Sequence, residues 1–84
     1  MSKYSPQQIL TLQSLSMDLL RVALGRHRGQ TEMAERFTIE AKKRLVEVPD
    51  FQYYSQIAST LDSSAERSAE DLLMYSTLVK NRAI

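Results

Sequence analysis

The chain has 84 residues, with 11 Lys or Arg, 10 Asp or Glu and no cysteine. This length predicts one domain over residues 1–84, and the lack of cysteine excludes disulfides and thiolate metal sites. Two glycines and two prolines are few, which favours helices over a fold of strands and turns. The net charge of +1 singles out no class of partner, and no apolar stretch is long enough to span a membrane. We therefore expect a soluble, cytoplasmic, all-α protein.

The first predicted helix covers residues 6–24. Ser5 and Gln8 have the spacing of a capping box at its start. Gly25 and Gly29 bracket the turn that follows, so this helix and the next should form an antiparallel hairpin. Apolar side chains cover roughly 240° of the first helix, far more than the ~100° arc of an ordinary amphipathic helix. A helix with so much apolar surface needs neighbours on two sides.

The second predicted helix covers residues 32–48, and Thr31 is expected to be its N-cap. Pro49 ends it, because the residue before a proline is disfavoured in helical geometry. Asp50 then caps a third helix, which is predicted over residues 51–61.

The sequence leaves open whether this third helix and a fourth over residues 65–82 are separate. Ser63 and Glu66 form a second capping-box pattern, which favours a new helix start. Apolar residues nevertheless recur at unbroken 3-4 spacing from residue 51 to residue 79, as in one long helix. The predicted fold is therefore an all-α bundle of three or four helices.

The predicted helices carry more apolar surface than a core of this size can hide. A chain of this length buries only roughly 63% of its unfolded surface on folding, so its core is marginal. We expect dimerisation to complete the bundle, most simply about a two-fold axis. The alternative is a monomer in which residues 6–24 form the central helix. The predicted oligomer interface consists of Leu10, Met17, Leu24, Met74 and Leu78.

Three further side chains are predicted to bind another protein. Ile39 and Val46 lie one heptad apart on the charged side of the second helix, outside its core stripe. Phe51 and Tyr54 share one side of the third helix, and Tyr53 points away from them. Because tyrosines make good interface anchors, Tyr53 is expected to need a partner.

A group of basic residues makes nucleic-acid binding the alternative function. Residues 21–44 hold seven Lys or Arg against three Asp or Glu, and such polarised charge can contact phosphates. The candidate contacts are Arg26, Arg28, Lys42, Lys43 and Arg44. Glu40 and Arg44 also have the i,i+4 spacing of an ordinary solvated helix face. The same charges are therefore explained without nucleic acid.

Catalytic and metal-binding patterns are weak in this chain. His27 is the only histidine, and neither a cysteine nor a serine–histidine–carboxylate order accompanies it. Glu66, Glu70 and Asp71 suit the start of a helix better than a metal site. No Gly-rich phosphate loop is present. We therefore predict no enzymatic activity, no metal and no cofactor.

Together these patterns predict a small protein–protein interaction module, a regulator, adaptor or assembly factor. It is expected to act as a homo-oligomer, to bind another protein and to make no contact with a membrane. A nucleic-acid-binding regulator is the alternative.

Overall fold

The computed structural model describes residues 4–63 and 67–83. Within them the chain forms four helices and no strand: α1 over Pro6–His27, α2 over Thr31–Leu45, α3 over Tyr54–Asp62 and α4 over Ser68–Arg82. The prediction of an all-α bundle is confirmed, and the bundle has four helices.

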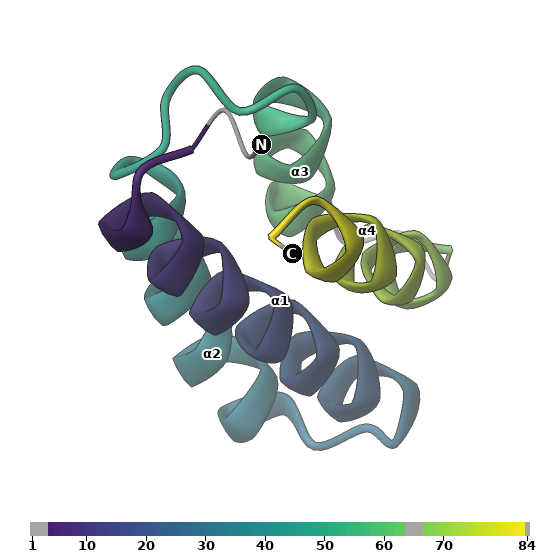
Figure 1. The fold of residues 1–84 in the computed structure, drawn as a ribbon. Coiled ribbons are helices and arrows are strands. Elements are labelled where there is room, and N and C mark those ends of the chain that lie inside the picture. Colours follow the sequence, from purple (N-terminus) through teal and green to yellow (C-terminus); the bar gives the residue numbers. More distant parts are fainter. Residues whose placement is uncertain (1–3, 64–66, 84) are drawn as a thin grey trace.

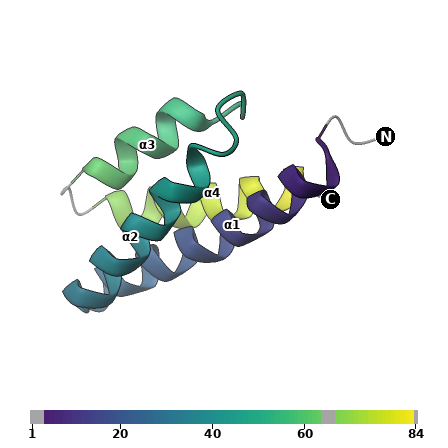
Figure 2. The ribbon, with the colours of Figure 1, turned by 90° about the vertical axis from the view of Figure 1, so that its left-hand side faces the viewer.

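α1 is the central helix of the bundle. It packs against α2 on one side and against α4 on the other, while α3 packs on α2 and α4 (Figure 1). Successive helices run in opposite directions, so α1 and α2 form the expected antiparallel hairpin (Figure 2). This arrangement gives α1 the two neighbours that its wide apolar surface requires. A third side of α1 remains outside the bundle.

The start of α1 is capped as predicted. The backbone N–H of Ser5 donates to Gln8 Oε1 at 2.9 Å, and the N–H of Gln8 donates to Ser5 Oγ at 3.1 Å. These two bonds satisfy backbone donors that have no partner within the helix. Because they depend only on neighbouring residues, they form as the local sequence predicts.

The predicted end of α1 is wrong, because the helix continues through Gly25 to His27. Gly25 is buried against α2, where a Cβ at its position would lie 3.1 Å from Ala34 Cβ. Glycine therefore lets the two helices approach closely instead of ending the first one. The turn itself uses Gly29, whose φ of 72° lies in the left-handed region.

The ends of α2 and the start of α3 also differ from the prediction. Gln30 is the N-cap of α2 in place of Thr31, and α2 ends at Leu45 before it reaches Pro49. A series of four-residue turns follows, in which the backbone N–H of Val48 donates to the Leu45 carbonyl oxygen, that of Phe51 to Val48 and that of Tyr54 to Phe51, each at 3.0 Å. The helix predicted from residue 51 therefore begins only at residue 54, after these turns.

α3 and α4 are two separate helices. Ser63, which follows α3, is extended, with φ −76° and ψ 137°. This backbone geometry ends the helix, so the apolar spacing that runs through residues 51–79 does not produce one continuous helix. Glu66, and with it the predicted capping box, lies outside the described residues.

The core lies between α1 and its neighbours α2 and α4, and α3 packs over α2 and α4. Leu12, Leu15 and Leu19 of α1 are fully buried there. α1 and α4 cross at two buried serines: Ser16 Oγ donates to the Ser76 carbonyl oxygen, and Ser76 Oγ donates to the Ser16 carbonyl oxygen, both at 2.8 Å. The rest of the core is formed by Val22, Ala23, Ala41, Leu45, Val48, Phe51, Ile57, Leu61, Leu72, Val79 and Ala83.

Candidate interaction surface

The third side of α1 carries a row of apolar side chains at seven-residue intervals. We call Leu10, Met17 and Leu24 the α1 row. Leu10 is 59% exposed and Met17 is 48% exposed, while Leu24 is half-buried. At about 100° per residue, Met17 lies roughly 160° around the helix from Leu15, which is fully buried. The α1 row therefore points away from the core.

The apolar row is exposed because the polar side of α1 is used for packing against α2. Asp18 is only 3% exposed and accepts a hydrogen bond from Arg44 Nε at 2.6 Å. Thr11 is also buried, and its Oγ1 lies 3.5 Å from Glu47 Oε2. A polar stripe on this helix thus faces protein, which leaves part of its wide apolar surface facing solvent.

The exposed side of α1 carries one charged side chain, Arg21, about 40° around the helix from Met17. Asp18 and Arg21 are the only charged residues between Pro6 and Leu24. Asp18 is buried, and Arg21 lies 3.5 Å from its Oδ1 and 5.1 Å from the centre of the Phe37 ring. Interface centres are depleted of charged residues in the same way. The composition of this surface therefore suits contact with protein better than contact with water.

α4 exposes one apolar side chain that belongs with the α1 row and two that do not. Leu73 is 48% exposed. It lies about 60° around α4 from Ser76, which faces α1, and roughly 160° from Tyr75, which faces α3. Leu73 therefore lies beside α1 on the side away from α3, as the α1 row does.

Met74 and Leu78 lie on a different face of α4. Each is two residues from Ser76, so each lies about 160° around the helix from the contact with α1. Met74 is exposed and Leu78 is half-buried. The five residues of the predicted oligomer interface are thus divided between two surfaces, with Leu10, Met17 and Leu24 on one of them.

The residues predicted to bind another protein also differ in their surroundings. Ile39 of α2 and Val46, the residue that follows α2, are both exposed. Tyr53 is half-buried, and its ring lies 5.9 Å from the Phe51 ring and 6.2 Å from the Tyr75 ring. The expectation that Tyr53 points away from Phe51 is wrong, because both residues precede α3 and helical spacing does not apply to them. The Tyr53 ring thus has aromatic contacts on both sides within the chain, and part of it remains exposed.

Most of the predicted nucleic-acid contacts are engaged within the protein. Lys42 pairs with Asp62, Lys43 with Glu40 at 3.7 Å and Arg44 with Asp18. Arg28 alone of the five is exposed without an ion pair to any residue in the described part of the chain. Arg26 and Arg44 thus serve internal contacts, whereas Arg28, Lys42 and Lys43 stay exposed.

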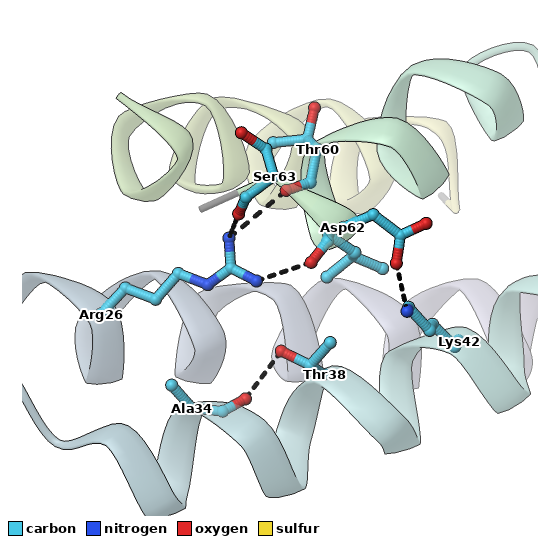
Figure 3. Close-up of polar contacts among 8 residues, drawn as sticks. Arg26, Ala34, Thr38, Lys42, Thr60, Asp62 and Ser63 are labelled. Carbon is cyan, nitrogen blue, oxygen red and sulfur yellow. Dashed lines mark hydrogen bonds and ion pairs between the residues drawn. The ribbon is translucent and has the colours of Figure 1, made fainter. Parts of the chain in front are cut away.

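Arg26 holds the end of α3. Its Nη1 donates to the carbonyl oxygens of Thr60 at 3.3 Å and Ser63 at 2.9 Å and to Ser68 Oγ at 2.8 Å, and its Nη2 donates to the Leu61 carbonyl oxygen at 2.7 Å. Figure 3 shows the side chain reaching from α1 across to this helix end. Carbonyls at the end of a helix lack partners within it, and a guanidinium can satisfy several of them. Burial lowers the pKa of the Arg26 guanidinium from its usual value.

This contact places Arg26 in the fold and not in an open basic turn. Because α1 continues to His27, Arg26 is a helical residue that faces the junction of α3 and α4. The acceptors lie 34 to 42 residues further along the chain. No spacing within residues 25–29 indicates them, so sequence reasoning missed this role.

A cleft of about 980 Å³ lies beside Arg26, between the α1–α2 turn and the α3–α4 junction. Its lining includes His27, Glu35, Asp62 and Glu70, all of them exposed. In residues 4–63 and 67–83, no three His, Cys, Asp or Glu side chains are grouped so as to hold a metal ion. Over the same residues, no helix has the length and apolar character needed to cross a membrane.

No protein-family model, no curated protein and no solved structure matches this chain. The surfaces and contacts of the structure are therefore the basis for a functional proposal.

Proposed function

We propose that this protein is a non-enzymatic protein–protein interaction module that acts as a homo-oligomer. Regulator, adaptor and assembly factor all fit such a module. The observation that supports the proposal is the α1 row, an exposed apolar row on the nearly uncharged side of the central helix. Exposed apolar side chains are ordinary when they are single, but grouped ones on one face mark interaction sites.

The apolar surface that the interface buries determines how tightly the two copies are expected to associate. Fully burying a Leu or Met side chain contributes ~1.5–3 kcal/mol. Leu10 and Met17 are about half exposed, so each contributes about 1 kcal/mol when covered. In a dimer the contribution is doubled, and Leu24 and Leu73 add to it. Association itself costs ~4–15 kcal/mol of lost freedom, which is as large as this gain, so we expect the association to be weak.

Sedimentation equilibrium over a range of protein concentrations tests the proposal. We expect the wild type to approach twice the 9.6 kDa mass of one chain. Met17→Glu and Leu10→Glu should shift the protein to the mass of one chain, because each places a charge in an apolar contact. Ile39→Glu is the matched control, since Ile39 is equally exposed on another helix and should leave the mass unchanged.

A wild type that keeps the mass of one chain throughout would contradict the proposal. Circular dichroism should show the same helix content in all variants, because the substituted side chains are exposed. This measurement separates loss of association from loss of folding.

A different protein that binds this chain would contact other exposed apolar side chains. Ile39 on α2, Val46 directly after α2, and Met74 with Leu78 on α4 lie outside the α1 row. A pull-down from the native cell, with and without nuclease, should recover a protein that is lost on Ile39→Glu or Met74→Glu substitution. Recovery that depends on nucleic acid would instead support the alternative function of the basic residues.

A further inference from the structure

The α1 row is symmetric about Met17. Leu10 and Leu24 lie seven residues before and after it, a span of about 21 Å at 1.5 Å per residue. When such a row meets its own copy in the opposite direction, Leu10 faces Leu24 of the second copy and Met17 faces its equivalent. A two-fold interface requires this kind of self-complementary surface.

We propose that the α1 row binds the α1 row of a second copy, antiparallel, about a two-fold axis at Met17. The inference rests on the proposed homo-oligomer and adds its partner surface and its geometry. The two-fold axis passes between the two α1 helices, perpendicular to the helix axes and to the line that joins them. Such an axis leaves both α4 helices on the same side of the α1–α1 contact. Leu73 of each copy then borders that contact.

Charge favours the antiparallel arrangement over the parallel one. The C-terminal end of α1 carries Arg26, His27 and Arg28, whereas Asp18, the one acidic residue of the helix, is buried near its middle. Parallel helices would bring these basic ends together and align their dipoles side by side. Antiparallel helices separate the two basic ends. Arg21 finds no charged residue of the second copy's α1 near it, since the residues level with it there are Gln13 and Ser14.

The area of the contact explains why Leu73 belongs to it. A standard stable interface buries about 800 Å² on each partner, compared with a total surface of 5537 Å² for this chain. The three side chains of the α1 row cover a smaller area than this. Leu73 and the α4 surface beside α1 widen the contact on one side, so a two-helix face of each copy takes part.

Single cysteines test this geometry cleanly, because the chain has none of its own. Disulfides form only when the Cα atoms are within about 7 Å. Under mild oxidation, Met17→Cys should cross-link to a species of twice the chain mass. Leu10→Cys and Leu24→Cys should each cross-link poorly alone and well when mixed. Ile39→Cys is the control, and Met17→Cys should give roughly tenfold more cross-linked dimer, because the complex raises the effective thiol concentration.

The other outcomes separate the inference from the proposed function. Self-cross-linking of Leu10→Cys and of Leu24→Cys would indicate parallel helices and overturn the antiparallel geometry. A dimeric mass without any cross-link in the α1 row would place the interface elsewhere and overturn the inference while the homo-oligomer stands. A wild type with the mass of one chain at every concentration would overturn the proposed homo-oligomer itself.

Discussion

Replacing Arg26 with alanine should destabilise the fold far more than the same change at Arg28. The two arginines lie two residues apart at the end of α1. The Arg26 guanidinium donates to four acceptors at the α3–α4 junction, whereas Arg28 is exposed and pairs with no charged group in the described structure. Both substitutions remove one positive charge, but only Arg26→Ala also removes these tertiary hydrogen bonds.

The expected loss for Arg26→Ala is about 2–3 kcal/mol of unfolding free energy. A hydrogen bond to a charged group contributes ~1.5–3 kcal/mol. The guanidinium is only partly buried, so water replaces some of the lost bonds, and the total stays far below four times that value. The whole stability expected for a domain of this size is about 4–13 kcal/mol. Arg26→Lys should lie between wild type and Arg26→Ala, because one ammonium cannot reach all four acceptors.

Urea unfolding followed by circular dichroism measures this difference. All variants should be compared at one protein concentration, because dimerisation adds to apparent stability. We expect Arg28→Ala to stay within about 0.5 kcal/mol of wild type, as surface substitutions usually do. If Arg26→Ala also stayed within that range, the contacts of Arg26 would contribute no net stability and the reasoning would be refuted.

Three further substitutions test other parts of the structure. Gly25→Val should cost about 2 kcal/mol by overpacking, because the Cβ, Cα and N atoms of Ala34 lie 3.1–3.2 Å from a Cβ at that position; an unchanged stability would rule out the close contact. Arg44→Ala should cost about 3 kcal/mol in thermal unfolding, more than Asp18→Asn, because it leaves a buried carboxylate with only a distant partner. A larger loss for Asp18→Asn than for Arg44→Ala would show that the Asp18–Arg44 pair contributes little to stability. In fluorescence anisotropy, DNA and RNA should not bind at physiological salt; binding that weakens steeply with salt and on Arg28→Ala would support the nucleic-acid alternative.

Local sequence determined which parts of this chain become helices. The Ser5–Gln8 capping box forms as its spacing predicts. The wide apolar surface of α1 correctly indicated two neighbours, and Leu10 and Met17 are exposed as the surplus of apolar surface predicts. The capping box and the width of the apolar surface depend on residues of one helix, so their physical causes are present in the sequence itself. The side of α1 that faces solvent depends also on the burial of Asp18 and Thr11.

Tertiary structure decided the roles of individual residues. Gly25 is helical because Ala34 packs against it, Asp18 is buried because Arg44 reaches it, and Arg26 holds a helix end instead of lining a turn. Tyr53 finds its ring contacts in Phe51 and Tyr75. Each outcome depends on groups brought together by the crossing of helices, and most of them are far apart in the chain. Spacing along one helix contains no information about such contacts, so only the packed structure assigns them.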